Sequence, residues 1–392
     1  FVRYNAKEQM SMKLKRKLSE FLKRETVLTV AVFLAIVSAV MTPPDREYAG
    51  YIDFRTLSIL FCLMTVMAGL QKLGVFRNIA KTLLRYTQNT IQLVEVLVLL
   101  CFFFSMIITN DVSLITFVPF TFIVLRLTGE EAVKKLAVPV IVLQTIAANL
   151  GSMLTPIGNP QNLYLYGKTQ MSAGTFILLM LPYSLVSLLL LVICGVIVAK
   201  RSRIEVRGAE VLLTEDEKLE QKKYLLPAYL LLFVLCLLTV AHMIPYPVTL
   251  VTVALAVLLL DRGTIIKVDY SLLLTFVGFF IFIGNMGRMP AFCDFLQKII
   301  GGREVMTAVI ASQVISNVPA ALLLSGFTEN ITALIIGTNL GGLGTLIASM
   351  ASLISYKQVA RQIPGEKKKY FGWFTIANIV FLMILVLENC LL

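Results

Sequence analysis

The stretch Asn149–Asn162 reads Asn-Leu-Gly-Ser-Met-Leu-Thr-Pro-Ile-Gly-Asn-Pro-Gln-Asn and lies inside the long apolar segment 132–166. A membrane-spanning helix needs an uninterrupted apolar run, because every backbone polar group in lipid must be bonded internally. Glycines, prolines and asparagines interrupt this run at about half its depth. Such a break is tolerated only where the freed backbone groups are buried in protein or line a cavity. The stretch therefore predicts a broken helix beside a binding site.

The break has a partner later in the chain. Shifted by 190 residues, 149–166 lies on 339–356 and 7 of 18 positions are identical, among them Asn149/Asn339, Gly151/Gly341 and Thr155/Thr345. A second pair, Thr109-Asn110-Asp111 and Ser316-Asn317-Val318, aligns at a shift of 207. Chance matches between apolar segments would be mostly Leu, Ile and Val, whereas these include Asn, Gly and Thr. The pattern indicates an internal repeat.

The composition predicts an all-α polytopic membrane protein. The chain has 392 residues, of which 58% are hydrophobic and 15% charged, and its mean hydropathy is +0.84. A soluble globular protein has about 25% charged residues. The net charge is +12. The positive residues lie in loops between apolar runs, so they indicate topology and not nucleic-acid binding. The six cysteines show no metal-ligand spacing.

Four segments organise the chain. We expect a cytoplasmic amphipathic N-terminus at 1–25, a first transmembrane repeat at 26–199, a charged cytoplasmic linker at 200–223, and a second, inverted transmembrane repeat at 224–392. A basic segment before an apolar one also fits a signal peptide. The long polar lead and the lack of a clean small-residue cleavage site favour a retained first span at 26–41.

Each repeat carries a pair of apolar half-segments with a polar centre. The first pair is 91–127 with Thr109-Asn110-Asp111 in the middle, and the second is 305–327 with Ser316-Asn317. Two full spans joined by a tight turn are one reading. A re-entrant helical hairpin, whose tip stops inside the membrane, is the other. The first tip has no Lys or Arg and no real loop, which favours the hairpin.

The positive charges predict the orientation. With the N-terminus in the cytoplasm, 29 of the 35 Lys and Arg residues fall in inner segments and 6 in outer ones. This split makes the two repeats inverted, so that the first hairpin enters from the cytoplasm and the second from outside. The expected location is the plasma (inner) membrane, as a multi-pass protein with its C-terminus outside.

Two hairpin tips and two broken helices related by inversion can meet near the bilayer midplane. Each tip begins a half-helix, whose N–H groups and dipole attract negative charge. Each break frees carbonyls that can coordinate Na⁺. The chain has one histidine and no recognisable hydrolase, metalloprotease or Walker motif, so we do not expect an enzyme or a cofactor.

The motifs Thr109-Asn110-Asp111, Thr155–Asn162, Ser316–Ala320 and Gly337–Thr345 resemble those of the ion transporter superfamily. This group contains citrate-transporter-like permeases, divalent-anion/sodium symporters, arsenite permeases and one type of Na⁺/H⁺ antiporter. The resemblance covers nearly all of 26–392. It implies an elevator-type secondary transporter, usually a homodimer in the lipid bilayer, with a small anion bound between the two hairpin tips.

The resemblance places the ligands at these motifs. The expected substrate-binding residues are Thr109, Asn110, Asp111, Pro156, Asn159, Ser316, Asn317, Thr338, Asn339 and Thr345. The expected cation-binding residues are Asn110, Asp111, Asn149, Gly151, Thr155, Gly158, Asn317, Asn339, Gly341 and Gly344. No metal site other than for a coupling Na⁺ is expected.

Both tips depart from the Ser-Asn-Thr of the divalent-anion symporters at their third position. Val318 cannot hydrogen-bond a carboxylate, and an ionised Asp111 would repel one. An Asn-Asp tip is similar to the arsenite permease and Na⁺/H⁺ antiporter branches. A charged side chain at membrane depth indicates function by default, although Asp111 could also simply cap a helix. The sequence thus predicts an anion transporter coupled to Na⁺ or H⁺, with an antiporter or a metalloid-efflux permease as the alternative. A passive channel fits less well.

Overall fold

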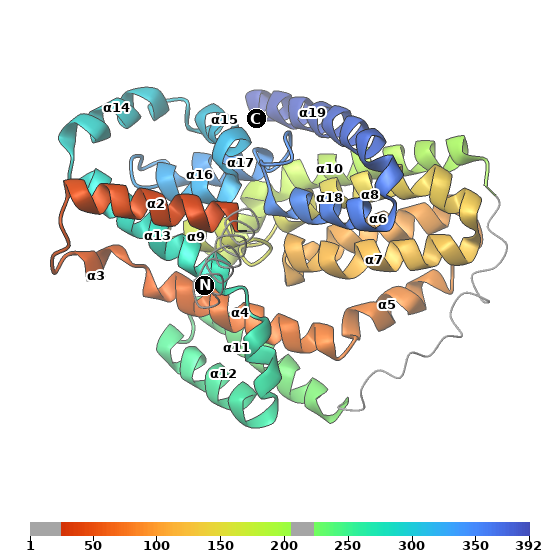
Figure 1. Ribbon diagram of the computed structural model, residues 1–392, viewed down its shortest axis with the longest axis horizontal. Coiled ribbons are helices and arrows are strands. Elements are labelled where there is room, and N and C mark those ends of the chain that lie inside the picture. The colour runs from red at the N-terminus through yellow and green to blue at the C-terminus, as the bar shows by residue number, and fades with distance from the viewer. Residues whose placement is uncertain (1–24, 205–222) are drawn as a thin grey trace, which may run out of the picture.

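The computed structural model describes residues 25–204 and 223–392, and within these ranges the chain forms helices and no strand (Figure 1). The predicted amphipathic N-terminus (1–24) and most of the predicted linker (205–222) lie outside the described residues. Seven of the described helices, counting the last one from Pro364, are long and apolar enough to cross a membrane. The expectation of an all-helical polytopic membrane protein is confirmed.

The helices of the first half follow the predicted spans closely. They are α2 (Thr26–Met41), α3 (Tyr48–Tyr51), α4 (Phe54–Lys72), α5 (Val75–Leu84), α6 (Thr90–Ile108), α7 (Asn110–Thr128), α8 (Glu130–Ser152), α9 (Pro160–Gly167) and α10 (Ala173–Ser202). Polar side chains cap several of these helices at their first turns. Asp53 accepts from the Thr56 N–H at the start of α4, and Asn89 accepts from the Gln92 N–H at the start of α6.

The second half repeats the order after two additional helices. It contains η2 (Lys223–Leu225), α11 (Leu226–Val240), α12 (Tyr246–Leu260), η3 (Arg262–Lys267), α13 (Tyr270–Gly287), α14 (Pro290–Ile300), α15 (Glu304–Ile315), α16 (Asn317–Leu324), α17 (Ile331–Leu340), α18 (Met350–Gln362), η4 (Pro364–Glu366) and α19 (Lys367–Leu391). Asp269 caps α13 through the Leu272 N–H, as Asp53 caps α4.

Two breaks divide helices as expected, but they differ in position. The first separates α8, of 23 residues, from α9, of 8 residues. The second separates α17, of 10 residues, from α18, of 13 residues. The first break therefore divides its own segment unequally. Helix α8 extends about 34 Å at 1.5 Å per residue, which exceeds the hydrocarbon thickness of about 30 Å.

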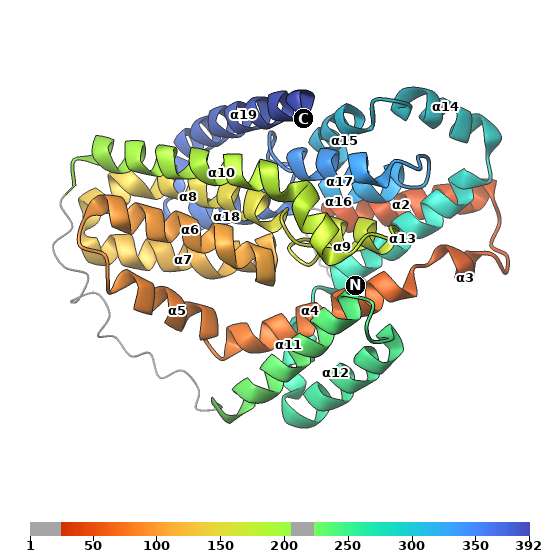
Figure 2. The ribbon, with the colours of Figure 1, turned by 180° about the vertical axis from the view of Figure 1, so that it is seen from behind.

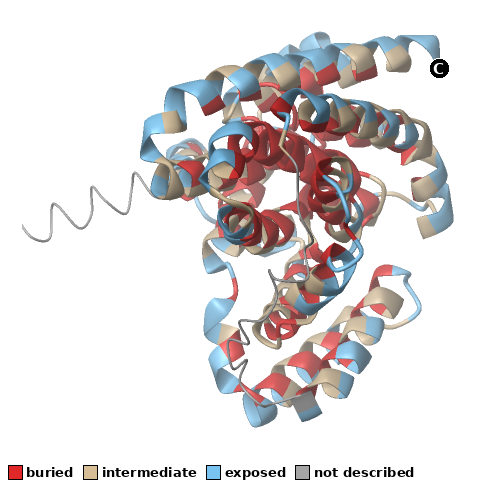
Figure 3. Ribbon diagram, turned by 90° about the vertical axis from the view of Figure 1, so that its right-hand side faces the viewer, coloured by how far each residue is buried: buried red, intermediate tan, exposed pale blue. Residues whose placement is uncertain are grey.

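We divide the helices into two groups, one of which carries the tips and the breaks. The core group consists of α6–α10 and α15–α19, and the flanking group of α2, α4, α11, α12 and α13 (Figures 1 and 2). Within the core group α8 packs against α6, α7, α10, α18 and α19, and it is the most buried of the seven candidate spans. Buried residues concentrate where the core-group helices meet (Figure 3). The groups touch where α4 packs against α9 and α13 packs against α16.

Helices α5 and α14 were not predicted, and each connects the flanking group to the core group (Figures 1 and 2). In α5 the buried side chains are Phe76, Ala80 and Leu84, which share one face at a spacing of four residues. This spacing was the available signal. The Lys and Arg residues of 72–90 mark it as an inner segment, and charge and amphipathic periodicity coexist in a helix at a membrane surface.

An ion pair lies at the end of the flanking group that the charge pattern places on the outer side of the membrane. Arg288, directly after α13, contacts Asp45 at 2.7 Å and donates to the Tyr51 hydroxyl at 3.1 Å. The hydrogen bond from the Arg288 guanidinium lowers the pKa of the Asp45 carboxyl, and the same bond raises the pKa of Arg288. Both groups are solvent-exposed, so this contact orders the α3 loop without adding much stability.

Four exposed glycines allow a test of the predicted inversion. No atom lies within 4 Å of a Cβ added at Gly50, Gly263, Gly287 or Gly365. Each of these glycines can therefore be replaced by cysteine in a variant from which the native cysteines have been removed. We expect G50C and G287C to react with an impermeant maleimide only from outside, and G263C and G365C only from the cytoplasm. Labelling of G287C and G365C from the same side would contradict the inversion.

Candidate functional site

Both hairpin tips have the same unusual backbone. Thr109 has φ 71° and ψ 152°, and Ser316 has φ 75° and ψ 154°. Residues other than glycine rarely adopt this region, and such strain persists only where the surroundings fix it. Here the following residue anchors each tip. The Asn110 N–H donates to the Gly158 carbonyl at 3.1 Å, and the Asn317 N–H donates to the Ala348 carbonyl at 2.9 Å. Each tip is thus fastened to the break of its own half.

Further contacts join corresponding residues of the two halves, as the shifts of 190 and 207 residues align them. The Thr155 hydroxyl donates to the Met106 carbonyl, and the Thr345 hydroxyl donates to the Gln313 carbonyl at 3.1 Å. A Cβ added at Gly151 would lie 2.6 Å from the Ser105 hydroxyl oxygen, and one added at Gly341 would lie 2.6 Å from that of Ser312. These glycines allow the break and the hairpin to approach closely in each half, which is the role that the structure gives to Gly151 and Gly341.

Asn149 connects the first hairpin tip to the second break. Its side-chain oxygen accepts from the Asn110 amide at 3.1 Å and from the Ser349 hydroxyl at 2.9 Å. Its amide donates to the Gly342 carbonyl at 3.4 Å and to Ser352 at 3.5 Å. One side chain therefore holds together segments that lie about 200 residues apart in the chain.

Asn339 makes the reciprocal connection, from the second break to the first. Its side-chain oxygen accepts from the Asn159 amide at 3.1 Å, and its amide donates to the Asn162 side-chain oxygen at 2.6 Å. Asn159 also caps α9 by accepting from the Asn162 N–H at 2.9 Å. All these asparagines are at most 5% exposed. We call the set Asn110, Asn149, Asn159, Asn162 and Asn339 the asparagine network.

Amide side chains already bind several of the freed carbonyls. The Asn162 amide donates to the carbonyls of Met153 and Thr155 in the first break. In the second break the Gln313 amide donates to the carbonyls of Gly341 and Leu343 at 3.0 and 2.9 Å. The Gln313 side-chain oxygen accepts from the Thr345 N–H at 2.9 Å. Gln313 was not predicted, and its counterpart in the first half is Met106.

The remaining predicted residues lie around the network with different roles. The second tip reaches it through Gly342, since the Asn317 amide nitrogen is 3.0 Å from the position of a Cβ at residue 342. The Ser316 hydroxyl donates to the Ala348 carbonyl at 3.4 Å. The Thr338 hydroxyl donates to Leu334 of its own helix, and Thr345 is exposed. Pro156 is buried within the first break, and Gly344 has φ 105° beside Gln313.

Asp111 lines a cavity of about 170 Å³ between the first tip and the flanking group. The buried Asn159 and Pro160 line it too, as do Lys267 and Asp269, which are exposed at the end that the charge pattern places in the cytoplasm. One carboxylate oxygen of Asp111, Oδ1, is buried and has no hydrogen-bond partner among the described residues. Thr109 lines the same cavity. The first tip therefore presents a carboxylate to a space that a small solute or an ion can enter.

A second cavity, of about 230 Å³, contacts the opposite end of α9. Tyr164, Lys168 and Asp53 line it, and it lies at the end that the charge pattern places outside. The Tyr164 hydroxyl shares a hydrogen bond of 2.9 Å with Ser325, and the Lys168 ammonium stands 5.4 Å from the centroid of the Tyr164 ring. Burial lowers the pKa of Lys168, and the Asp53 charge opposes that shift. The short helix α9 thus separates two cavities.

Glu95 is a further carboxylate that the sequence interpretation missed. It lies in α6, and both of its side-chain oxygens are buried without a hydrogen-bond partner in the described part of the chain. The rule that singled out Asp111, a lone charge within an apolar run, applies equally to Glu95. It stands about 21 Å along the helix from the tip at 1.5 Å per residue, so it does not belong to the site around Asp111.

We expect Gln313→Met to destabilise the protein. Methionine is the residue at the corresponding position of the first half and keeps the volume, but it leaves the carbonyls of Gly341 and Leu343 unpaired. An unsatisfied buried polar group costs about 1–3 kcal/mol. Thermal unfolding in detergent should show the loss, whereas Gln297→Met, at an exposed position of α14, should leave the midpoint unchanged. Equal midpoints for the two variants would show that Gln313 does not support the break.

Comparison with known proteins agrees with this architecture. A family described as citrate transporter matches residues 18–331. An uncharacterized transporter of Methanocaldococcus jannaschii is 31% identical over 361 residues, covering 92% of this chain and 94% of that protein. The inner membrane protein YbiR of Escherichia coli is 32% identical over 320 residues, covering 80% of this chain and 82% of that protein. A silicon efflux transporter of Oryza sativa is 32% identical over 153 residues, covering 38% and 30%.

The helical fold and these likenesses define the chain as a multi-pass membrane transporter. The names of the family and of its relatives point to transport and not to catalysis. The family match covers most of the chain, and the archaeal relative is aligned over nearly its whole length. The chain belongs to the citrate transporter family.

Proposed function

We propose that the protein is a secondary active transporter that moves a small anion, a carboxylate or an inorganic oxyanion, coupled to Na⁺ or H⁺. The observation that carries the proposal is the asparagine network, which joins the first tip and both breaks inside an apolar bundle. Several amide groups that need partners are costly in such an interior unless they serve a site. Their concentration at one place supports a binding function.

Helix ends support an anion as the substrate. Helices α7, α9, α16 and α18 all begin at the tips or breaks, so the positive ends of four helix dipoles face this region. The first N–H of each tip helix is bonded to a break carbonyl, so attraction comes from the dipoles and from amide side chains. Neutral donors of this kind bind an anion and still release it, because no fixed positive charge holds it.

Oxygen atoms beside the same helix ends support a coupling cation. The first tip contributes the Asp111 carboxylate oxygen that has no partner among the described residues. The Asn149 side-chain oxygen, which accepts a hydrogen bond from the Asn110 amide, lies beside this tip. A carboxylate can accept either H⁺ or Na⁺. The residues proposed to bind the cation are therefore those of the first tip and break, with Asp111 at the centre, since the second tip, Ser316-Asn317-Val318, has no carboxylate.

The division into two helix groups supports an elevator mechanism. The core group carries the tips and breaks, the flanking group packs against it through α4 and α13, and α5 and α14 connect the two. Cavities at both ends of α9 border this interface. Displacement of the core group along α4 and α13 would expose the tips alternately to the two cavities. We further propose a homodimer in the plasma membrane, with the N-terminus in the cytoplasm and the C-terminus outside.

Efflux of a metalloid oxyacid, or Na⁺/H⁺ antiport, is the second candidate. The observation that favours it is Asp111, because a carboxylate at the tip repels a dianion but can exchange a proton for a neutral or weakly ionised solute. Its name assigns silicon efflux to the relative from Oryza sativa. Both candidates use the same tip and differ in what enters the cavity beside Asp111.

Reconstituted protein separates these candidates. Proteoliposomes with an imposed Na⁺ or pH gradient would be tested for saturable uptake of sulfate, dicarboxylates, citrate, arsenite and silicic acid, with empty liposomes as the control. A thermal-shift screen would first select solutes, since a ligand that binds only the folded state raises its stability. Gradient-driven, saturable uptake of an anion supports the proposal. Flux that only follows the concentration gradient of the solute and does not saturate would indicate a channel and overturn it.

A further inference from the structure

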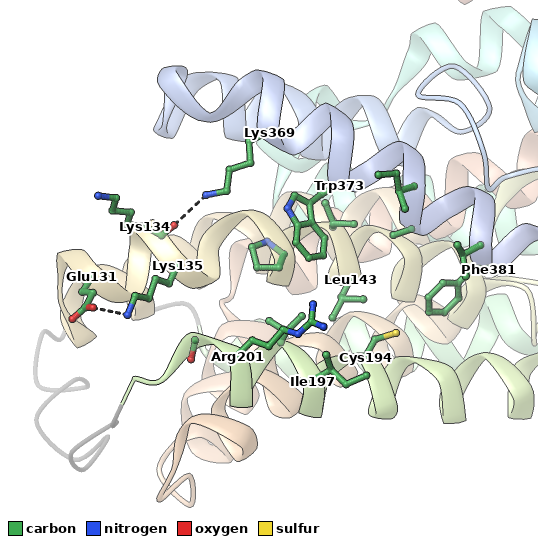
Figure 4. A pocket seen from close by; sticks show the side chains of 17 residues that line it. Glu131, Lys134, Lys135, Leu143, Cys194, Ile197, Arg201, Lys369, Trp373 and Phe381 are labelled. Carbon is green, nitrogen blue, oxygen red and sulfur yellow. Dashed lines mark hydrogen bonds and ion pairs between the residues drawn. The ribbon is translucent and has the colours of Figure 1, made fainter.

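A groove of about 700 Å³ lies on the surface of the core group, between α8, α10 and α19 (Figure 4). Its volume falls within the range of sites for small molecules, about 300–1,000 Å³. None of its lining residues belongs to the asparagine network or to the cavity beside Asp111. The transport mechanism proposed above gives this groove no function.

Most of the groove is apolar. Val142, Leu143 and Phe381 form a buried floor, and the exposed side chains of Ile197 and Trp373 border it. Along α8 the lining runs from Glu131 to Leu143, and this is about 18 Å at 1.5 Å per residue. One leaflet of the hydrocarbon core is about 15 Å deep, half of the total. The groove therefore has the length of a single leaflet.

One end of the groove is basic. Lys134, Lys135 and Lys369 lie toward this end on α8 and α19, and the Arg201 side chain extends from α10 into the groove (Figure 4). Glu131 pairs with Lys135 at 2.6 Å, and Glu366 pairs with Lys369 at 3.0 Å. The charged groups of Lys134 and Arg201 have no ion pair or hydrogen bond in the described residues, and the guanidinium of Arg201 lies within the groove near Leu143 (Figure 4). Within the part of the chain that the structure describes, these two positive groups thus form no ion pair beside the apolar channel.

We propose that this groove binds an anionic phospholipid. The phosphate of the head group would contact Arg201, Lys134 would add positive charge at the end where α8 begins, and one acyl chain would lie over Val142 and Phe381. Trp373 stands between the basic end and the apolar floor, where tryptophan favours the membrane interface. The lipid would belong to the leaflet on the side of the N-terminus of α8, which the charge pattern places in the cytoplasm. Basic pockets between helices on that side suit anionic head groups.

The charge argues against a second copy of the chain as the occupant. Two copies in one membrane share their orientation, so a two-fold contact at this groove would bring two basic ends to the same depth. Like charges that meet in this way repel each other. A zwitterionic lipid would fill the apolar part but would leave Lys134 and Arg201 without a net negative partner.

Native mass spectrometry of the full chain, titrated with phosphatidylglycerol or with phosphatidylcholine of the same acyl chains, tests the proposal. We expect wild-type protein to retain phosphatidylglycerol preferentially. The double variant Lys134→Gln/Arg201→Gln should bind it about 25-fold more weakly, at about fivefold for each charge near a membrane surface. The control Lys367→Gln/Lys368→Gln removes two exposed charges at the start of α19 that do not line the groove, and it should bind like wild type.

A second variant tests the apolar part. Ala377 lines the groove and is half-buried, so Ala377→Trp would fill the space for the acyl chain and should reduce retention of phosphatidylglycerol with all charges kept. Equal binding of the two lipids by wild type would overturn the proposal, as would equal losses in the two lysine-containing double variants. A dimer that dissociates in Ala377→Trp would instead identify the groove as a protein interface.

Discussion

Asn149→Leu should lower transport by about 100-fold while the protein remains folded. The substitution removes one side chain that contacts the first tip, two residues of the second break and Ser352 of α18. The Asn110 amide and the Ser349 hydroxyl lose their acceptor, at about 1–3 kcal/mol for each unpaired group. A loss of about 2.8 kcal/mol in binding corresponds to 100-fold. Initial rates in proteoliposomes, together with the midpoint of thermal unfolding, would measure both effects.

Asn378→Leu is the matched control. Asn378 is as deeply buried as Asn149, but its amide donates at 2.8 Å to the Phe374 carbonyl within its own helix, α19. The same change of side chain there should affect stability and leave transport near normal. Asn339→Leu, which breaks the reciprocal connection, should resemble Asn149→Leu. Normal rates in both network variants would place the substrate elsewhere.

Asp111→Asn should abolish accumulation against a gradient and preserve exchange. Asparagine keeps the shape of the side chain but can no longer gain or lose a proton. Asp111 is the second residue of α7, after the N-cap position Thr109, and its Oδ1 has no hydrogen-bond partner among the described residues, so helix capping does not account for this carboxylate. If the coupling ion binds this carboxylate, the variant will only equilibrate substrate across the membrane. Uptake under an imposed pH or Na⁺ gradient and counterflow of labelled substrate without a gradient would be measured side by side.

Glu95→Gln provides the comparison for that experiment. It also neutralises a carboxylate whose oxygens are buried without partners in the part of the chain that the structure describes, but it does so far along α6 from the tip. Accumulation should survive in Glu95→Gln. If Asp111→Asn accumulates substrate like wild type, with the same dependence on pH and Na⁺, Asp111 does not bind the coupling ion and the simple anion symporter becomes the better description.

Most of the helices could be predicted from the sequence because hydropathy and interrupting residues mark them directly. The first span, 26–41, has the predicted limits, and the tips at Thr109 and Ser316 fall between helices as expected. The asparagines of the network could also be predicted, because they are polar residues that interrupt apolar runs. Such residues are costly in lipid, so their presence alone indicated that they meet partners inside the protein.

The partners themselves could not be predicted. The hydrogen bonds between Asn149 and Ser349 and between Asn339 and Asn162 depend on how the two halves pack. A single sequence contains no signal for that packing. Gln313 was missed because a glutamine within an apolar helix has no fixed role until the carbonyls beside it are known. The unequal lengths of α8 and α9 were missed because apolar composition alone does not show where along the segment the helix ends.

The short helix between the two cavities has an electrical consequence. Helix α9 has 8 residues and extends about 12 Å, against a hydrocarbon thickness of about 30 Å. Water in the cavities at its two ends would conduct, so most of the membrane potential would fall across this short barrier and not across the whole bilayer. Each elementary charge that the core group carries past α9 would then gain or lose about 2.3 kcal/mol per 100 mV. Transport of a monovalent anion with one proton, or of a dianion with two, would move no net charge and its driving force would be independent of voltage, whereas a ratio that moves net charge would make accumulation depend on it.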